Sequence, residues 1–418
     1  MTDQPIEVTV QIDSEDVRAG VLWPHTSRQG DSATFEYDRD YFGHSRSYDL
    51  DPALPRVAGR LHTPAGVAIF GAMGDCAPDS WGRTLILRNE RESALREGRA
   101  PRQIREIDFL LGARDDQRQG ALRFQRNGGS FLADGERGVP PVVNLPRLLN
   151  AAMEFERDTA NASDLRLLLR AGGSLGGARP KSHVLDKQGR VLIAKFPRVT
   201  QDKWDVTTWE AITLDLARRA GVDTPEFSLR QVDGRPVLLI HRFDRDEAGS
   251  RVGYVSGMTL LETTDGQTHD YLDLADVIAQ NSPSVIADLH ELWRRVAFGR
   301  MLHNTDDHLR NHGFLRQTDA GWSLSPVFDV NPNPEPGEFR TTLGGGDGDH
   351  PDVLLDTTVA ATFRLKPDQA KAVLREVAEA LSSWREVASS YGAPRKEVEL
   401  MADAFESPAV IAIREALK

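Results

Sequence analysis

The residues best suited to chemistry lie in one short segment, NTDDHLRN at residues 304–311. Asp306 and Asn311 have four residues between them, which is the Asp-x-x-x-x-Asn spacing of a loop that catalyses phosphoryl transfer. Such a short loop can point a carboxylate at an acceptor hydroxyl and an amide oxygen at Mg²⁺ on adjacent sides of one phosphoryl group. Asp329, in the run PVFDVN at residues 326–331, is the candidate for a second metal ligand.

A glycine-rich turn and two lysines precede this loop. The turn GGSLGG at residues 172–177 carries few bulky side chains, so its backbone amides can approach phosphate oxygens closely. Lys181 follows on the next expected strand, and Lys195 lies among apolar residues in VLIAKFP at 191–197, an arrangement that can present an ammonium group to phosphates. Glu210, at the start of the next expected helix, is a candidate ion-pair partner for Lys195. These groups are what phosphoryl transfer requires.

Taken alone, each of these features has a simpler explanation. A glycine-rich segment before a hairpin is most often only a turn, a strand lysine often faces solvent, and a first-turn glutamate complements the helix dipole. The turn is not a Walker A loop, because Pro180 and not a glycine precedes Lys181. The argument for phosphoryl transfer therefore depends on the order in which the features occur.

Zinc is the alternative metal. His308 and His312 are four residues apart, which suits two imidazoles on one face of a helix. However, Leu309 stands where the zinc-protease motif has its glutamate, and Gly313 would end a helix at once. Mg²⁺ is therefore favoured over zinc.

The composition limits the class of protein. At 418 residues with 39% hydrophobic residues, the chain is long enough for two or three folded domains. Its net charge of −12 argues against a protein whose whole surface coats nucleic acid. The single cysteine, Cys76, excludes an intramolecular disulfide and is expected to be an inert core residue. Neither a secretory signal nor an apolar stretch of the roughly 20 residues that span a membrane is visible, so a cytoplasmic protein is expected.

Hydrophobic period and turn residues predict the elements that must position these groups. Residues 6–37 alternate as a small antiparallel sheet, and residues 285–303 form a helix on which Arg294, Arg295 and Arg300 are expected to face solvent. The other expected strands are 120–124, 181–185, 190–196, 226–231 and 236–242, and the other expected helices are 84–99, 102–111, 145–169, 209–220, 367–391 and 395–417.

This order predicts an α+β protein with a two-lobed, protein-kinase-like fold. An N-terminal β-rich accessory domain occupies residues 1–140, a small sheet-containing lobe with the glycine-rich turn occupies 141–243, and a mostly helical lobe with the catalytic loop occupies 244–418. The glycines and prolines between residues 128 and 141 mark the linker after the first domain.

Several ordered motifs resemble the HipA family of bacterial toxin–antitoxin serine/threonine kinases along nearly the full chain. They are SLGGARPK at 174–181, IAKFP at 193–197, HRFDR at 241–245, NTDDHLRN at 304–311, and Phe328 with Asp329. The run PDSWGR at 78–83 also resembles the accessory region of that family. Several motifs in a compatible order are far more specific than any one of them.

The resemblance implies a role for each matching residue. Asp306 matches the catalytic aspartate, and Asn311 and Asp329 match the Mg²⁺ ligands. His308 would lie beside the nucleotide, and Ser174 occupies the position of autophosphorylation, where a phosphate should repel nucleotide phosphates. The remaining nucleotide-binding residues are Leu175, Gly176, Gly177, Lys181 and Lys195 for the phosphates, His241 to Phe243 for the adenine through the backbone, and Asp244 for the ribose.

The resemblance also implies a function. The chain is expected to be an ATP- and Mg²⁺-dependent serine/threonine protein kinase that acts on the translation machinery, such as an aminoacyl-tRNA synthetase, and arrests growth. A helix-turn-helix antitoxin is the expected partner, and DNA contact would come mainly through that partner. Two other classes stay open: a small-molecule phosphotransferase, because these motifs do not identify the acceptor, and a nucleotide-binding regulator without catalysis.

Overall fold

The computed structural model describes residues 4–28, 30–126, 128–132, 138–172, 177–199, 202–318, 321–344 and 351–418. Its contacts divide the chain into two compact units. Unit 1 comprises Met1–Gln201 with Arg230–Val255, and unit 2 comprises Asp202–Leu229 with Ser256–Lys418. The three predicted domains stay a prediction beside this division. Each unit is described on its own.

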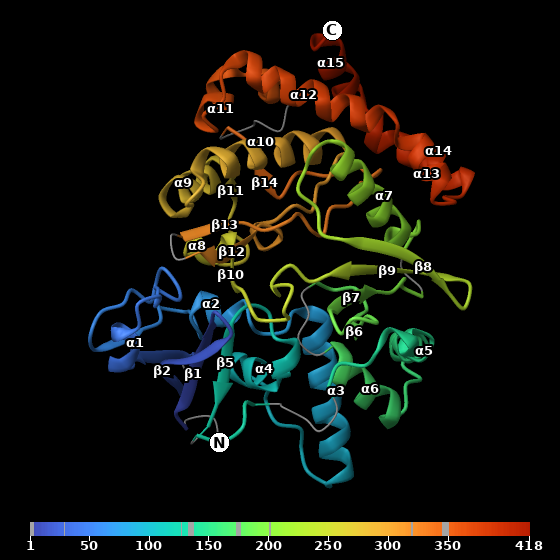
Figure 1. The fold of residues 1–418 in the computed structure, drawn as a ribbon. Helices are drawn as coiled ribbons and strands as arrows, with labels where there is room; N and C mark the ends of the chain where they lie inside the picture. Colours follow the sequence, from blue (N-terminus) through green and yellow to red (C-terminus); the bar gives the residue numbers. More distant parts are fainter. Residues whose placement is uncertain are drawn as a thin grey trace. The chain divides into compact units, whose positions relative to one another are not determined.

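A five-stranded sheet begins unit 1 (Figure 1). Its order is β4-β3-β2-β1-β5, from the strands β1 (Ile6–Ile12), β2 (Glu15–His25), β3 (Ser32–Tyr37), β4 (Arg60–His62) and β5 (Leu122–Gln125). Val8 pairs with Phe124, and both are fully buried. The apolar positions in the alternating pattern of residues 6–37 thus form the face of this sheet that packs against a core.

Six helices lie in the described residues of unit 1. They are α1 (Arg39–Gly43), α2 (Gly71–Gly74), α3 (Ser80–Arg96), α4 (Glu106–Gly112), α5 (Leu145–Glu156) and α6 (Ala162–Gly172), with 3₁₀ turns at Asp115–Gln117 and Val142–Asn144. The helical pattern at 145–169 is therefore two helices. Asp158, at φ +60°, lies in the turn between them, and Asn161 caps α6 by accepting the amides of Ser163 and Asp164.

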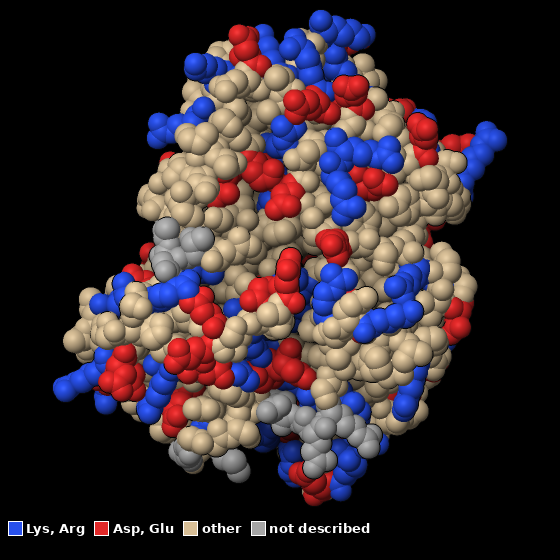
Figure 2. Space-filling view, in the orientation of Figure 1, with Lys and Arg blue, Asp and Glu red and all other residues tan. Residues whose placement is uncertain are grey.

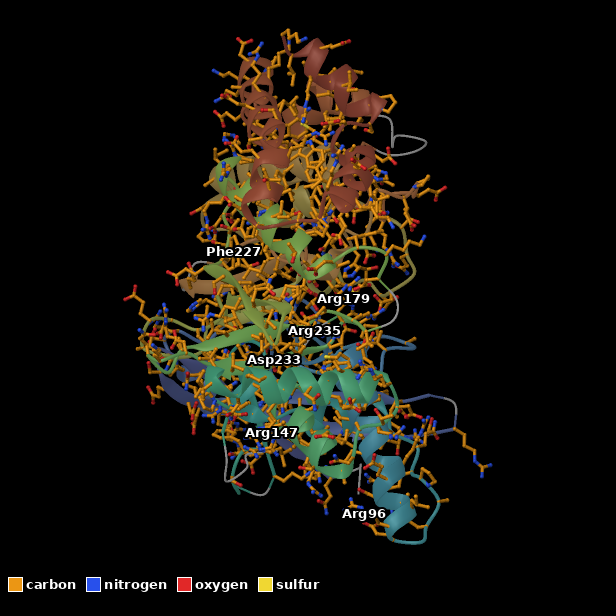
Figure 3. The ribbon with its side chains drawn as sticks, turned by 90° about the vertical axis from the view of Figure 1, so that its right-hand side faces the viewer. Arg96, Arg147, Arg179, Phe227, Asp233 and Arg235 are labelled. Atoms are coloured by element: carbon orange, nitrogen blue, oxygen red, sulfur yellow. The ribbon has the colours of Figure 1, made fainter. Side chains whose placement is uncertain are left out.

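The second sheet of unit 1 has the order β6-β7-β9-β8. Its strands are β6 (Lys181–Leu185), β7 (Val191–Lys195), β8 (Phe227–Val232) and β9 (Arg235–His241), and residues 230–232 of β8 belong to unit 1. Asp233 and Gly234 both have positive φ, as a two-residue type I′ hairpin requires. Figure 3 labels Asp233 and Arg235 at this turn. The two predicted hairpins are confirmed.

The two faces of this sheet differ in character. Val184, Leu192 and Ala194 belong to a core cluster with the leucines of α5 and α6 and with Trp81 and Leu85 of α3. Because successive side chains of a strand point to opposite faces, Lys181, His183 and Lys195 must lie on the other face. The helices thus cover one face, and the lysines occupy the opposite one.

A buried ion network ties segment 115–123 to segment 242–251 within unit 1. The Asp244 carboxylate is almost fully buried and accepts hydrogen bonds from Arg242 (2.5 and 2.8 Å), Arg245 (2.9 Å) and the Gly120 amide (2.7 Å). Burial alone would raise the pKa of Asp244, but Arg242 and Arg245 outweigh it and hold that pKa well below its usual value. Both arginines also donate to the carbonyl of Arg118.

Unit 2 is mostly helical. Its helices are α7 (Val206–Arg219), α8 (Gly257–Leu260), α9 (Tyr271–Asn281), α10 (Val285–Met301), α11 (Thr357–Thr362), α12 (Pro367–Ser382), α13 (Trp384–Ser390), α14 (Arg395–Phe405) and α15 (Pro408–Ala416), with 3₁₀ turns at Leu309–Asn311 and Pro351–Leu355. Helix α12 packs against α10 (Figure 1). Trp384 stacks on Phe405 with ring centroids 4.7 Å apart, and Trp209 of α7 lies beside both.

The C-terminal helical prediction needs two corrections. The pattern at 367–391 divides at Ser383 into α12 and α13, and the pattern at 395–417 divides before Pro408 into α14 and α15. Pro408 lies in the first turn of α15, where its missing N–H costs nothing. Unit 2 also contains an antiparallel hairpin, β12 (Gly313–Thr318) with β13 (Gly321–Leu324), and a parallel pair, β11 (His269–Asp270) with β14 (Thr341–Thr342). The short strand β10 (Gly253–Ser256) lies where the chain passes from unit 1 to unit 2.

The remaining expectations concern single side chains and the surface. Cys76 is buried, as predicted. The expectation that Arg295 and Arg300 face solvent is wrong, because both are buried and each donates to a backbone carbonyl, of Ser325 and Thr341 respectively. Figure 2 shows basic and acidic side chains interspersed over the face in view. Among the described residues, no helix is long and apolar enough to cross a membrane.

Replacing Asp244 with Asn should lower the free energy of unfolding by about 3–5 kcal/mol, because the buried Arg242 and Arg245 lose the charge that compensates them. Since folding lowers the pKa of Asp244, its stabilisation is present above the unfolded value of about 3.9 and is lost as the pH falls below it. Urea denaturation between pH 3 and 7 measures both effects. The exposed Glu247→Gln is the control, and equal stability of D244N and this control would contradict the prediction.

Candidate active site

Register places the two candidate phosphate-binding lysines opposite each other. Lys181 of β6 pairs directly with Lys195 of β7, and directly paired residues point to the same face with Cβ atoms about 4.5–5.5 Å apart. Both lysines are buried, with 4% and 8% of their surface exposed. This register gives one face of the sheet two buried lysine side chains, and their positive charges can attract an anionic ligand to that face. Unit 1 therefore brings these two predicted residues together.

The glycine-rich turn is described only at its two ends. Ser174, Leu175 and Gly176 lie outside the described residues, so their predicted roles stay predictions. Gly177 has a positive φ of 81°, which only glycine adopts without strain. Its amide donates to the Asp79 carboxylate, and its carbonyl accepts the Trp81 amide. Figure 3 labels Arg179 on the segment that leads from Gly177 to Lys181.

The predicted adenine-binding segment follows β9. His241 ends that strand opposite Leu192, and Phe243 lies against Tyr254 with ring centroids 6.5 Å apart. Asp244, predicted to reach the ribose, has both carboxylate oxygens engaged by protein donors. In this structure Asp244 therefore fixes the position of the segment, and its ribose contact stays a prediction.

One histidine joins that segment to the lysine face. His183 of β6 is fully buried, and its Nε2 lies 2.8 Å from a guanidinium nitrogen of Arg242. Burial and the neighbouring Arg242 and Arg245 hold the pKa of His183 well below its usual value. His183 is therefore neutral at pH 7, and it adds no further positive charge beside the lysines.

In unit 2, the segment 304–311 follows α10 and presents Asp306 at the surface. The Asp306 side chain is 74% exposed, and its carboxylate lies 2.8 Å from the guanidinium of Arg340, which is 65% exposed. A pair this exposed contributes about 0–1 kcal/mol, so Arg340 can leave the carboxylate at little cost. The backbone of Arg340 is fixed separately, because its amide donates to the Thr305 carbonyl. Asp306 is thus open to an acceptor hydroxyl.

The next residue, Asp307, fixes the loop through contacts with Tyr271, His312 and Thr341. Its carboxylate accepts the Tyr271 hydroxyl at 2.5 Å and lies 3.2 Å from Nε2 of His312, and its carbonyl accepts the Thr341 hydroxyl at 2.6 Å. Burial would raise the pKa of Asp307, but His312 and the Tyr271 hydroxyl outweigh it and lower that pKa. Asp307 stays charged at neutral pH. Its hydrogen bonds fix the backbone next to Asp306.

The predicted Mg²⁺ ligands supply oxygen atoms, as Mg²⁺ requires. The side-chain NH₂ of Asn311 donates to the Asp306 carbonyl at 3.3 Å, which leaves its amide oxygen as the atom to meet a metal. Asp329 adopts a φ of +56°, a left-handed conformation that aspartate tolerates better than most non-glycine residues. Two residues later, the side-chain oxygen of Asn331 is buried without a hydrogen-bond partner among the described residues. These oxygen atoms are of the kind that Mg²⁺ prefers, and their convergence on one ion stays a prediction.

The histidines of the loop do not form a zinc site in the described part of the chain. His308 is half-buried, and its Nδ1 has no hydrogen-bond partner among the described residues. His312 turns toward Asp307 and lies edge-on to Tyr271 with centroids 5.7 Å apart. The described residues contain no group of three or more His, Cys, Asp or Glu side chains that could hold a metal ion. His308 therefore stays a prediction as a nucleotide neighbour.

The predicted residues thus form two sets, one in each unit. Unit 1 holds Gly177, Lys181, Lys195, His241, Phe243 and Asp244, and unit 2 holds Glu210, Asp306, His308, Asn311 and Asp329. Glu210 is buried in α7. Its pairing with Lys195 and the convergence of both sets on one nucleotide stay predictions.

Several supporting residues escape sequence reasoning. Tyr271 and Thr341 hold Asp307 from positions 36 and 34 residues away in sequence, and Arg300, which lies over the ring of Phe339, holds the Thr341 carbonyl. Asn333 donates to the Thr305 hydroxyl, and its carbonyl lies 2.6 Å from Nδ1 of His303. No sequence pattern predicts the positive φ of His303. The asparagines and prolines at residues 331–336 do indicate an irregular loop, which includes Asn333.

Comparison with known proteins agrees with this geometry. The family model of the HipA-like C-terminal domain matches residues 173–385. A Haemophilus influenzae protein named "Putative kinase" is 26% identical over 196 residues, which cover 41% of this chain and 56% of the relative. A Sinorhizobium fredii protein named "Putative kinase Y4mE" is 25% identical over 150 residues, a third of each chain. The matches thus span about half and a third of these relatives.

A solved structure establishes the fold. The chain matches the Shewanella oneidensis MR-1 toxin–antitoxin complex of HipA, HipB and its operator DNA, with a TM-score of 0.70 and 16% identity over 98% of this chain and 97% of the other. The predicted α+β, two-lobed, kinase-like class is confirmed. Because the family model covers just over half of its residues and the fold extends along nearly all of them, the chain belongs to the HipA family.

Proposed function

We propose that the protein is a kinase that uses ATP and Mg²⁺ to phosphorylate a serine or threonine of a protein. The observation that carries the proposal is the loop at 304–311. It presents the exposed Asp306 carboxylate on a backbone held by the partly buried Asp307 and by the Asn311 amide. A phosphoryl-transfer enzyme needs this combination, because its catalytic power comes from positioning and electrostatics.

The chain's own residues divide the work between them. Asp306 would orient the acceptor hydroxyl and accept its proton as the bond to phosphorus forms. Lys181 and Lys195 would neutralise the triphosphate, and the Gly177 segment would hold the backbone that carries Lys181. Asn311 and Asp329 would hold Mg²⁺, which supplies charge stabilisation to the phosphoryl oxygens. Arg340 would leave Asp306 when the acceptor arrives.

The substrate and partners are proposed by relationship. We expect a target in the translation machinery, such as an aminoacyl-tRNA synthetase, and a helix-turn-helix antitoxin that neutralises the protein and makes the main contact with DNA. The Shewanella complex, in which HipA is joined by HipB and operator DNA, supports the antitoxin and the DNA contact. The net charge of −12 fits a protein that reaches DNA through its partner. Ser174 is proposed as the site of autophosphorylation.

Asp306→Asn and Asp329→Asn should each lower the turnover number by about 10³-fold or more, because each removes a charge that acts in the transition state. Transfer of the labelled γ-phosphate of ATP to protein measures this loss. Asp368→Asn, a change of the same kind in the exposed first turn of α12, is the control. Circular dichroism should show that all three variants are folded, and normal turnover in both D306N and D329N would refute the assignment.

Lys181→Met and Lys195→Met should each raise the dissociation constant of Mg·ATP by roughly 10- to 100-fold. Each change removes a charged contact to phosphate worth about 1.5–3 kcal/mol and keeps the length of the side chain. Titration with a fluorescent ATP analogue measures the binding. Lys187→Met, in the exposed turn between β6 and β7, is the matched control, and equal affinity in all three variants would exclude the lysine face as the phosphate site.

Phosphoproteomics after induction of the native protein and of D306N should identify the target. New phosphoserine or phosphothreonine sites should appear with the native protein and not with the variant, and a phosphate on Ser174 would identify autophosphorylation in the same experiment. Label transfer to small alcohols but to no protein would indicate a small-molecule phosphotransferase. Nucleotide binding with an unchanged growth phenotype in D306N would indicate a regulator without catalysis.

A further inference from the structure

The start of α3 makes contacts that the proposed function does not yet use. The run PDSWGR at residues 78–83 precedes the glycine-rich turn by nearly a hundred residues. Asp79 caps α3, with its carboxylate accepting the Ser80 amide at 2.6 Å. The other carboxylate oxygen accepts the amide of Gly177. One aspartate therefore fixes both the start of a helix and the end of the turn.

Trp81 strengthens the same connection from the first turn of α3. Its backbone amide donates to the Gly177 carbonyl at 3.2 Å, and its indole N–H donates to the Lys181 carbonyl at 3.0 Å. The ring is nearly fully buried and packs edge-on against Phe155 of α5, with centroids 5.3 Å apart. Trp81 is thus held by the core and in turn holds both ends of the segment 177–181.

Close packing leaves this connection little freedom. A Cβ atom on Gly172, the last residue of α6, would lie 2.5 Å from the Lys181 carbonyl oxygen and 3.3 Å from the indole nitrogen of Trp81. No real side chain tolerates the first distance. On the other side, the Phe196 amide donates to the Pro180 carbonyl at 2.9 Å, which ties the segment to the end of β7. The backbone that carries Lys181 is therefore fixed from three sides.

Charge complements the packing. Burial would raise the pKa of Asp79, but the amides of Gly177 and Ser80 and the charge of Lys181 outweigh it and lower that pKa. Asp79 therefore stays ionised at neutral pH and offsets part of the positive charge of the lysine pair. Arg83 holds the start of α3 in place, because it donates to the Pro78 carbonyl at 2.9 Å and forms a bidentate pair with Glu106 at 2.5 and 2.6 Å.

We propose that Asp79 and Trp81 are positioning residues of the nucleotide site, which hold the Gly177–Lys181 segment so that Lys181 meets the phosphates of ATP beside Lys195. The proposal rests on the proposed function and extends it to the N-terminal part of the chain. The resemblance alone marks residues 78–83 only as part of an accessory region.

The test compares Trp81→Phe, Asp79→Asn and Asp79→Ala in the full chain. W81F keeps the buried ring and removes only the indole donor. D79N keeps one acceptor for the helix cap and removes the charge, whereas D79A removes both. The controls are Trp23→Phe in β2 and Asp38→Asn, because Asp38 caps α1 by accepting the Asp40 amide in the same way.

The expected result is a split between binding and turnover. The dissociation constant of a fluorescent ATP analogue with Mg²⁺ and the KM for ATP should rise about 10-fold in W81F and D79N and further in D79A, as the loss of a hydrogen bond worth about 1.4 kcal/mol implies. The turnover number at saturating ATP should change less than 3-fold. A merely structural role would lower the melting temperature and leave the KM unchanged well below melting. Unchanged ATP affinity in folded W81F and D79A would overturn the proposal.

A second measurement does not depend on nucleotide. Amide hydrogen exchange of peptides covering residues 177–185 should be faster in D79A and W81F than in native protein, and unchanged in the two controls. Equal exchange in all five proteins would also overturn the proposal. If the native protein binds no nucleotide, the proposed function and this proposal both fail. If the native protein binds and the variants bind equally well, only this proposal fails.

Discussion

The nucleotide half of the candidate site depends on one strand register. Pairing of β6 with β7 sets Lys181 directly opposite Lys195, on the face opposite the one that packs against the helices. A slip of one residue would turn one lysine into the leucine-rich core beneath the sheet. Hydrogen bonds from the Asp186 amide to the Arg190 carbonyl and from the Gly189 amide to the Asp186 carbonyl close the hairpin and fix this register. The β6–β7 hairpin thus determines where Lys181 and Lys195 could contact a phosphate.

Both units use the same device around their candidate site residues. In each unit, a carboxylate with little exposure to solvent is held ionised by protein donors next to a residue predicted to act in the site. In unit 2 this carboxylate is Asp307, next to Asp306, and in unit 1 it is Asp244, directly after the predicted adenine-binding segment. A charge pair of this kind adds little stability relative to an apolar replacement of both partners, but removal of one partner alone is costly. The neighbouring aspartates of one motif can therefore differ in role: Asp307 fixes the loop, and Asp306 is the candidate catalytic residue.

The sequence predicts the parts of this molecule that depend on local pattern. Alternation and turn residues identify the hairpins, and the spacing of Asp306 and Asn311 identifies the loop. The sequence does not predict that Arg300 is buried, that Tyr271 supports Asp307, or that Trp81 reaches Lys181, because those contacts join residues 36 to 100 positions apart. Helical period also continues through the breaks at Ser383 and before Pro408, since adjacent helices bury the same stripe. Long-range contacts thus decide what local pattern leaves open.

The division of the chain has a consequence for how the protein can be handled. Each unit is assembled from two separate stretches, so the polypeptide crosses the boundary three times. A stop codon after residue 201 would leave β6 and β7 without β9, their neighbour in the sheet. Neither unit can be produced as one uninterrupted fragment, and fusion or shuffling of gene segments would have to transfer both together. A fragment that contains only one of the two stretches of a unit is therefore expected to remain unfolded in the cell.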